Sequence, residues 1–446
     1  MKKNKQKIFS ADWLEFHPYK NSANTDLYYV QLCNRVYNAI DHATEQISDE
    51  NYLFLSDDEK KDLSCILTAY FEDIISQSQI WNTFVKECKE QTGKWLPYFD
   101  TTDYAEEEIN EVDLRFLCWH FLTQLNQGQI PISPMEPLFA EITNAVYPIF
   151  DEAFETAPEN EKMREFFELN EEEGNLYDVQ SKFFWLGTES YLFHFNSLDL
   201  ERELDDVLEV AKEHQLEEQL AEMVNMVMTD FSFNNITEFF RMTSAQWLAK
   251  ILGEENGLYE PLMTMTLKKS GYFIFQEQDS MYAQFRHVAT GEILNVTNRS
   301  LVGFPKDLKS TEVMVFAGFV EWQGEWWFIG DLRGYDVSDE LIAEISSREE
   351  EIDLFKEEEK EVLSTEEQDV LGEEFLTTKR AENPEDEEVD ICWGLLYDEK
   401  LSPEYLTEAV ALDKYPGLRF PETDGDKLMK ENFSFTLGYF RRNPNN

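Results

Sequence analysis

Apolar residues recur at helical spacing through the first 261 residues of the chain. The clearest set falls on one face of a helix that begins near Asp26, and its members are Leu27, Val30, Cys33, Val36, Tyr37 and Ile40. Ser56 stands three residues before Glu59, which is the spacing of a capping box and predicts the start of another helix. The same pattern predicts further helices over residues 136–155, 160–169, 177–193, 198–228 and 243–252. Residues 1–261 are therefore expected to form a helical domain.

After residue 261 the period of the apolar positions changes from helical to alternating. Strands are predicted over residues 262–268, 271–276, 281–288, 292–297, 313–322 and 325–329. Thr290-Gly291 and Gln323-Gly324 have the composition of tight turns between paired strands. Several short strands within about 70 residues are typical of a small β-barrel. We expect residues 262–334 to form a barrel of the SH3-like or OB-like type.

The chain becomes strongly acidic after residue 334. Runs of glutamate at residues 349–351 and 357–359 predict an acidic helix, followed by a linker that extends to residue 390. Apolar residues return in residues 391–446, which are expected to form a C-terminal helical segment that packs on the body. The predicted fold class is therefore α+β, with a large helical domain, a small barrel and an acidic tail.

The charge is distributed unevenly over these parts. The chain of 446 residues carries 38 Lys+Arg against 91 Asp+Glu, a formal net charge of −53, yet it is 42% hydrophobic and so has material for a core. Residues 1–261 hold 19 basic and 51 acidic residues, residues 262–334 hold 7 and 8, and residues 335–446 hold 12 and 32. The acidic parts disfavour contact with nucleic acid or anionic lipid and favour a basic protein partner, whereas the barrel is free of this restriction.

The sequence favours a cytoplasmic protein without a membrane span. It contains no apolar run of the length that a bilayer requires, and Asp12 and Glu15 interrupt any signal-peptide core. The cysteines number five and form no CxxC pair. We expect them to be buried free thiols in a reducing compartment.

Two groups of residues in the helical region are candidates for a pocket. His17 and Tyr19 place an imidazole beside an aromatic ring, which either lines a pocket or anchors an N-terminal arm. Asp113, Arg115 and His120 lie within two helical turns of one another. They predict either an acid–base or anion-binding group of a hydrolase, or a partly buried ion pair with a core histidine.

A third candidate site lies on the predicted barrel. Trp322, Trp326 and Trp327 surround a tight turn, and with Arg286 and His287 they offer a stacking surface for a single-stranded nucleic acid or a peptide. The alternative is that the tryptophans fill the core. Trp326 and Trp327 are neighbours in a strand and must point to opposite faces.

Specific catalytic and ligand-binding motifs are absent from the sequence. The six histidines show neither HExxH spacing nor pairing with cysteine, and no EF-hand loop, phosphate-binding loop or GxSxG motif occurs. We therefore assign no metal, no cofactor and no catalytic residue, and expect the acidic runs to be solvated faces.

Two blocks of the sequence resemble a known family. The WLxxHPYK block at residues 13–20 is similar to the start of a bacterial protein family of unknown function. The block DLRFLCWH at residues 113–120 is similar to a second block of that family. The resemblance implies a bacterial cytoplasmic protein and supplies no catalytic residues.

Three function classes remain open at this point. The leading hypothesis is a non-enzymatic binding or adaptor protein that recognises a basic partner through its acidic body. The first alternative is a hydrolase-type enzyme with a pocket in the helical domain. The second alternative is a nucleic-acid-associated protein that acts through the barrel.

Overall fold

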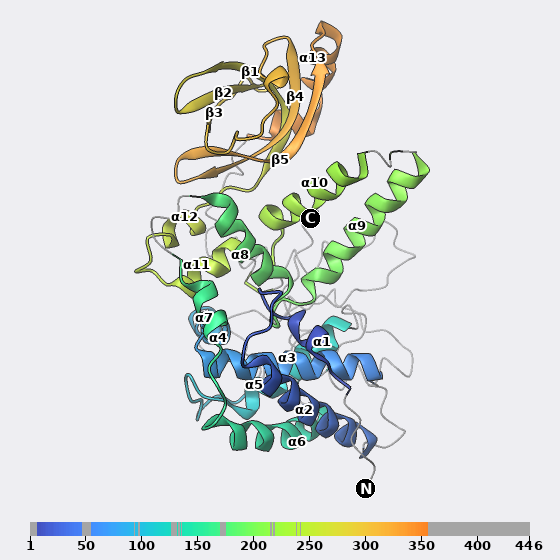
Figure 1. Ribbon diagram of the computed structural model, residues 1–446, viewed down its shortest axis with the longest axis vertical. Helices are drawn as coiled ribbons and strands as arrows, with labels where there is room; N and C mark the ends of the chain where they lie inside the picture. Colours follow the sequence, from blue (N-terminus) through green and yellow to red (C-terminus); the bar gives the residue numbers. More distant parts are fainter. Residues whose placement is uncertain are drawn as a thin grey trace, which may run out of the picture.

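The computed structural model describes residues 7–46 and 55–355, apart from gaps at residues 93, 97–98, 126–131, 133, 135, 170–174, 215, 217–218, 238 and 241. These residues form an elongated molecule with three tiers along its long axis (Figure 1). The predicted C-terminal segment at residues 391–446, and the linker before it, lie outside the described residues.

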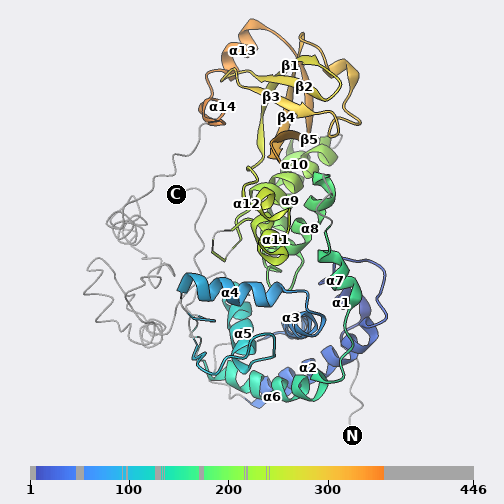
Figure 2. The same ribbon diagram turned by 90° about the vertical axis from the view of Figure 1, so that its left-hand side faces the viewer.

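The lower tier is helical (Figures 1 and 2). Its helices are α1 (Ser10–Leu14), α2 (Asp26–Gln46), α3 (Asp57–Ser76), α4 (Ile80–Thr92), α5 (Glu111–Leu125), α6 (Pro137–Phe154) and α7 (Glu161–Phe167). The middle tier is also helical and consists of α8 (Leu176–Thr188), α9 (Asn196–Glu213), α10 (Leu220–Asn234), α11 (Ser244–Leu252) and α12 (Tyr259–Met263).

Helix α3 is the centre of the lower tier. The predicted capping box is present, because Glu59 N–H donates to the Ser56 side chain and Glu59 in turn accepts from Ser56 N–H. The helix contacts α2, α4, α5 and α7. Its polar residues are enclosed together with its apolar ones, so its side chains need polar partners inside the core.

Most of the predicted helices are present, with one exception. The predicted helix over residues 198–228 is wrong as a single element, because the structure has two helices there, α9 and α10. The chain turns after α9 through a hydrogen bond from Leu216 N–H to the Ala211 carbonyl. This break contains neither glycine nor proline, so the apolar spacing alone did not reveal it.

The upper tier is a curled sheet of β1 (Lys269–Gln278), β2 (Tyr282–His287), β3 (Ile293–Thr297), β4 (Val313–Trp322) and β5 (Glu325–Asp336). The predicted turn at Gln323-Gly324 connects β4 to β5, and both residues adopt positive φ, at 53° and 75°. The predicted strand at residues 262–268 is wrong. Leu262 instead belongs to α12 and packs in the helical core, and a short apolar run does not by itself distinguish strand from helix.

The strands have the order β1-β2-β3-β5-β4, and β1 pairs with both β2 and β4. The ring closes through one parallel pair, Val296 with Trp326, whereas the other neighbours are antiparallel. With so little pairing at that seam, the tier is better described as a curled sheet than as a true barrel. The α+β class is confirmed, and the SH3-like or OB-like type stays a prediction.

The sheet shares its core with the helices below it. Val320, Trp322, Trp327 and Ile329 belong to the same apolar cluster as the helical tiers. Tyr177 Oη on α8 donates to the Phe328 carbonyl at 2.7 Å, and Lys268 Nζ lies 3.0 Å from an Asp230 carboxylate oxygen on α10. Domain boundaries at residues 261 and 334 stay a prediction, and the contacts described here run across the first of them.

Two short helices follow the sheet, α13 (Asp339–Ile345) and α14 (Glu349–Asp353). Ile345 is buried against Ile274, Val288 and Met314 on the sheet. The acidic stretch is therefore partly held against the sheet where the structure describes it.

Two expectations about the whole chain are tested by the described residues. Cys33, Cys65, Cys88 and Cys118 are buried free thiols, as predicted, and Cys392 lies outside the described residues. No described helix is both long enough and apolar enough to cross a membrane.

We predict that Trp327→Ala lowers the free energy of unfolding by about 3–5 kcal/mol, because the side chain is buried between the sheet and the helices. Urea unfolding measures this change. The control is Met281→Ala, whose side chain is exposed and whose loss is expected to cost under about 0.5 kcal/mol. A cost below about 1 kcal/mol for Trp327→Ala would contradict the shared core.

Candidate functional site

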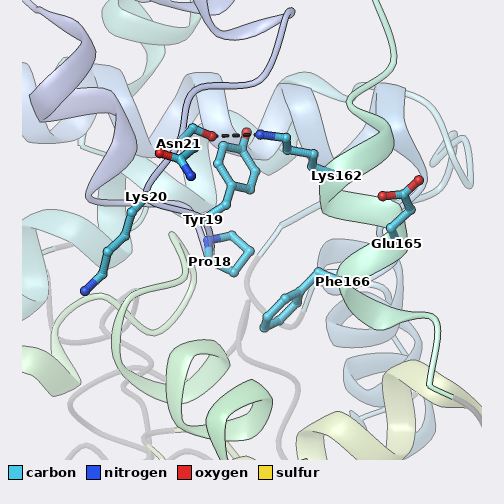
Figure 3. A pocket seen from close by; sticks show the side chains of 7 residues that line it. All are labelled: Pro18, Tyr19, Lys20, Asn21, Lys162, Glu165 and Phe166. Carbon is cyan, nitrogen blue, oxygen red and sulfur yellow. Dashed lines mark hydrogen bonds between the residues drawn. The ribbon is translucent and has the colours of Figure 1, made fainter. Parts of the chain in front are cut away.

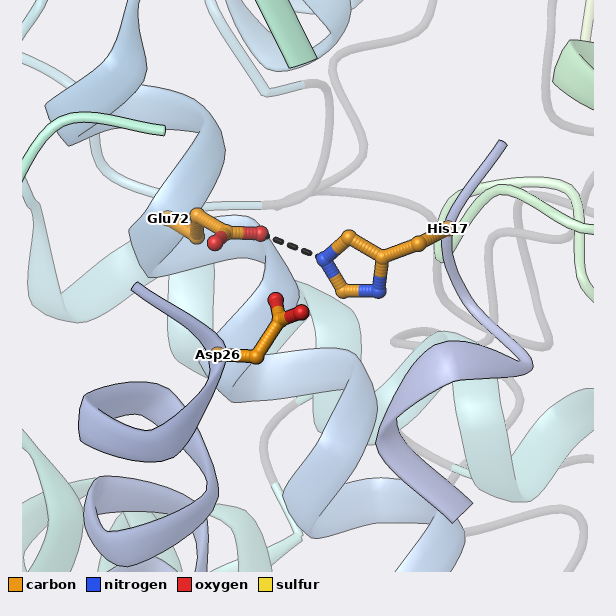
Figure 4. A group of neighbouring side chains, drawn as sticks. All are labelled: His17, Asp26 and Glu72. Atoms are coloured by element: carbon orange, nitrogen blue, oxygen red, sulfur yellow. Dashed lines mark hydrogen bonds and ion pairs between the residues drawn. The ribbon is translucent and has the colours of Figure 1, made fainter. Parts of the chain in front are cut away.

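The segment after α1 carries His17 back into the lower tier, where it meets carboxylates from two other segments. Asp26 lies at the start of α2 and Glu72 lies on α3, and the three side chains converge (Figure 4). His17 Nε2 lies 2.6 Å from Glu72 Oε2. One ligand-type atom from each residue lies within 4.8 Å of the others.

Tyr19 and Asn160 complete this group, which we call the His17 cluster: His17, Tyr19, Asp26, Glu72 and Asn160. Tyr19 Oη donates to Asp26 Oδ1 at 3.0 Å. Asn160 Nδ2 donates to Tyr19 Oη at 2.6 Å and to Glu72 Oε1 at 3.0 Å. Three segments distant in the sequence, residues 17–26, α3 and the start of α7, are thus joined through polar side chains.

The proton positions on His17 follow from its partners. Nδ1 lies 2.9 Å from the Trp13 carbonyl oxygen, which only accepts, so Nδ1 carries a proton. Nε2 therefore faces Glu72 either as the donor of an imidazolium or with a lone pair. Burial lowers the pKa of His17, but the charge of Glu72 and the hydrogen bonds to Glu72 and Trp13 outweigh it, and the net shift is upward. The surroundings of His17 therefore favour its imidazolium form more than water does.

A pocket of about 310 Å³ opens beside the cluster (Figure 3). Its lining residues are Pro18, Tyr19, Lys20, Asn21, Lys162, Glu165 and Phe166. Lys162 Nζ donates to the Asn21 carbonyl at 2.8 Å and lies 4.9 Å from the centre of the Tyr19 ring. Tyr19 belongs both to the lining and to the His17 cluster, whereas the other members of the cluster are outside the lining.

Asp113 lies on α5 in a separate buried group. It accepts from Tyr70 Oη at 2.6 Å and from Asn110 Nδ2 at 3.2 Å. Desolvation raises the pKa of Asp113 to about 7, although these hydrogen bonds oppose the shift. Its carboxyl group is fully enclosed and contacts no solvent.

His120 and Arg115 do not join Asp113 in an open pocket. His120 is buried beside the rings of Phe195 and Phe239, and desolvation lowers its pKa to about 3, so the ring is neutral at neutral pH. Arg115 follows Asp113 by two positions, which is about 200° around the helix, and is half-buried. The enclosure of Asp113 and His120 favours the alternative of a core histidine, and the acid–base group at these residues stays a prediction.

The three tryptophans of the sheet are divided between two cores. Trp322 and Trp327 are buried in the core shared with the helices, and Trp326 is partly buried on the inner side of the sheet. The two covered rings favour the alternative that these tryptophans fill the core, and the common stacking surface stays a prediction. The prediction that Trp326 and Trp327 face opposite ways is confirmed.

Arg286 and His287 also differ in their surroundings. Arg286 is half-buried on β2, whereas His287 is enclosed. Thr290 N–H donates to His287 Nδ1, so Nε2 carries the proton and donates to Glu351 Oε2 on α14 at 2.7 Å. His287 therefore ties α14 to the sheet and is not open to a ligand.

The middle tier carries a strongly acidic helix. Of the 18 residues of α9, seven are acidic and two are basic. Asp205, Asp206, Glu209 and Glu213 are all exposed, and they lie on the side of the helix away from buried Leu200 and Ala211. Figure 1 shows α9 and α10 side by side, and α10 is the neighbour that α9 contacts most.

The sequence analysis missed several members of these groups. Asp26 was assigned to a helix start, and Glu72, Asn160 and Glu351 were not singled out. Glu72 and Asn160 are 55 or more residues from His17 or from each other, and no short motif links them. Glu72 lies within α3 and Asn160 precedes α7 as its N-cap residue, and neither position carried a local signal for the other.

Comparisons with known proteins give one result. A family model described as a protein of unknown function (DUF3843) matches residues 7–266, more than half of the chain. No curated protein and no solved structure matches the chain. The match confirms the resemblance to a family of unknown function. It covers α1 to α12, with the His17 cluster, the Asp113 group and α9, and ends before the sheet.

We predict that Asp113→Asn increases stability more at about pH 8 than at about pH 4. Because its pKa is raised, Asp113 in the folded protein keeps its proton up to about pH 7. In the unfolded chain the same carboxyl group loses its proton near about pH 4. Wild-type stability therefore falls as pH rises from about 4 towards about 7 and stays reduced above it. Asparagine keeps an acceptor for Tyr70 and avoids this loss. Thermal unfolding across the pH range measures the difference in Tm.

The control for this experiment is Asp103→Asn, which removes one negative charge at an exposed position. Its Tm change reports the effect of net charge alone. If the Tm change of Asp113→Asn followed the same pH dependence as that of Asp103→Asn, the buried, protonated state of Asp113 would be ruled out.

Proposed function

Because the chain belongs to the DUF3843 family of proteins of unknown function, the proposal has to come from the structure, and we propose a non-enzymatic binding protein. Its partner is a basic amphipathic segment of another protein. The binding surface is formed by α9 and α10, which we call the acidic hairpin. The observation that carries this proposal is the row of exposed carboxylates on α9.

Helix α9, which carries the acidic row, has a net charge of −5 over 18 residues, from seven acidic and two basic side chains. Several of these carboxylates crowd one another. Burial, together with the charges of Asp230 and Asp206, raises the pKa of Glu203. Like charges held this close repel each other, and a cationic partner relieves that repulsion.

Apolar side chains that are not enclosed occur on both helices of the acidic hairpin. On α10, Met223, Val224, Met226, Val227 and Met228 are all half-buried and not enclosed. On α9, Leu198 and Val210 are exposed. Methionine side chains adapt to different partners, and a surface that combines apolar side chains with one sign of charge suits an amphipathic helix.

Within the described residues, the acidic hairpin is anchored at one side and is not covered at the other. Arg333 Nε on β5 donates to Glu222 at 2.7 Å, and Asn225 Nδ2 donates to the Gly330 carbonyl at 3.0 Å. These contacts hold α10 against the sheet, while α9 has few neighbours beyond α10 and α8. A fixed scaffold with one open helix is a suitable docking element.

The two other function classes receive less support from the geometry. A hydrolase centred on Asp113 and His120 would need these residues to reach a substrate, but both are enclosed. A nucleic-acid site on the sheet would need exposed stacking rings, but Trp322 and Trp327 are covered. The overall charge of −53 adds electrostatic steering towards a cationic partner.

We predict that Asp205→Asn, Asp206→Asn and Glu209→Gln together weaken binding of a basic amphipathic peptide by about tenfold. The probe is a labelled synthetic helix with Lys on one face and Leu on the other, followed by fluorescence anisotropy. Binding is expected to weaken as the salt concentration rises, because the exposed charges are screened.

Two controls distinguish binding at the acidic hairpin from non-specific electrostatic attraction to an acidic protein. The triple change Glu106→Gln, Glu107→Gln and Glu108→Gln removes three exposed charges elsewhere and is expected to change Kd by under about twofold. A scrambled peptide of the same composition, with no segregated faces, is expected to bind more weakly. Equal losses for both triple variants, or equal affinity for both peptides, would refute the docking site.

A further inference from the structure

We propose that the His17 cluster is a closed site for one divalent transition-metal ion, with His17, Asp26 and Glu72 as ligands. This inference is independent of the acidic hairpin. It rests on the geometry of three buried side chains, on their charge and on an unsatisfied acceptor beside them.

The three ligand side chains converge from separate segments and are all buried. His17, Asp26 and Glu72 are 4%, 2% and 2% exposed. Their nearest ligand-type atoms lie within 4.8 Å of one another. Ligands that share a tetrahedral ion lie about 3.3 Å apart, so small side-chain rotations would bring all three atoms to one centre.

The histidine is oriented as metal-binding histidines are. Its Nδ1–H donates to the Trp13 carbonyl, which fixes the ring and directs Nε2 towards Glu72. Histidines that bind metals through one ring nitrogen usually donate the other N–H to a carbonyl or carboxylate. Replacing the proton between Nε2 and Glu72 by an ion preserves this arrangement.

The cluster buries more negative than positive charge. Glu72 pairs with His17, and among the described residues no lysine or arginine forms an ion pair with Asp26 or Glu72. Lys162, the cation near Tyr19, donates to the carbonyls of Asn21 and Ser22 on the pocket side. A single imidazolium leaves one carboxylate uncompensated, and a divalent ion would balance both.

Asn160 provides the second observation that points to a ligand. Its Nδ2 contacts Tyr19 and Glu72, which places the amide at the cluster. The residue is 1% exposed, and its Oδ1 is a buried acceptor with no hydrogen-bond partner among the described residues. Amide oxygens are metal ligands, and a half-turn of the amide would bring Oδ1 to the cluster in place of Nδ2 as a fourth donor atom.

The carboxylates retain lone pairs for an ion. A carboxylate has about four acceptor positions. Asp26 accepts from Trp13 Nε1, Tyr19 Oη and Ala23 N–H, and Glu72 accepts from His17 and Asn160. Each therefore has at least one position left, and the existing donors would orient the carboxylates as outer partners do around bound metals.

The donor set selects the class of ion. Imidazole with carboxylates suits Zn²⁺, Fe²⁺ or Mn²⁺, whereas Mg²⁺ and Ca²⁺ prefer oxygen alone. Among these ions the general affinity order places Zn²⁺ above Mn²⁺. The closed, nearly dry surroundings leave no open position for a substrate, so the ion is structural and fastens the N-terminal segment to α3.

The first experiment measures metal content and stability of the full chain. The protein is stripped with a chelator and titrated with Zn²⁺, Mn²⁺ and Mg²⁺ separately. We expect one equivalent of Zn²⁺ to bind and to raise Tm by several degrees, a weaker effect of Mn²⁺, and no comparable effect of Mg²⁺. A Tm unchanged by Zn²⁺, or changed equally by Mg²⁺, would overturn the proposal.

Matched variants separate this site from the acidic surface. His17→Gln and Glu72→Gln each remove a ligand and are expected to weaken Zn²⁺ binding by about a hundredfold or more. The control is Asp73→Asn on the next position of α3, a buried carboxylate that accepts from Tyr191 and lies outside the cluster. It is expected to lower Tm and keep Zn²⁺ binding. Equal binding by all variants would place the ion elsewhere.

The second experiment uses the wild-type protein, so its outcome does not depend on whether a variant folds. Crystals of the wild-type protein, grown with Zn²⁺, are measured at the zinc absorption edge. An anomalous peak between His17 Nε2, Asp26 and Glu72 supports the proposal. Anomalous peaks confined to surface carboxylates would overturn it and would leave the cluster as a hydrogen-bonded network without an ion.

Discussion

The enclosure of α3 is the constraint on which the rest of the helical body depends. A polar group that is buried without a partner costs free energy, so each polar side chain of this helix requires a partner from another segment. Glu72 is met by His17 and Asn160, and Asp73 by Tyr191 and the amide N–H groups at the start of α4. These contacts position the N-terminal segment, α4 and the segment after α8 around one helix.

The sequence pattern correctly predicted those features that depend on residues close together in the chain. The Ser56 capping box, the Gln323-Gly324 turn and the opposite directions of Trp326 and Trp327 all follow from neighbours within a few residues. The division between α9 and α10, and the helical state of Leu262, depend on packing against distant segments. Spacing along the chain carries no information on those contacts.

The candidate sites depend even more on contacts between distant segments, which the sequence pattern does not reveal. His17 and Tyr19 were recognised because they stand two positions apart in an aromatic block, but Glu72 and Asn160 reach them only through the tertiary fold. Asp113 and His120 share a helix face, yet the fold seals both in the core. The molecule thus separates its polar groups into two kinds: enclosed clusters that join segments, and the exposed carboxylates of α9 that face outward.

Amide hydrogen exchange of the wild type and of Glu72→Gln tests the central position of α3 most directly. The account predicts that the amides of residues 63–75 are among the slowest to exchange. It also predicts that Glu72→Gln accelerates exchange in the N-terminal segment, residues 10–26, more than in the sheet. Fast exchange along α3 in the wild type, or equal acceleration throughout the variant, would contradict it.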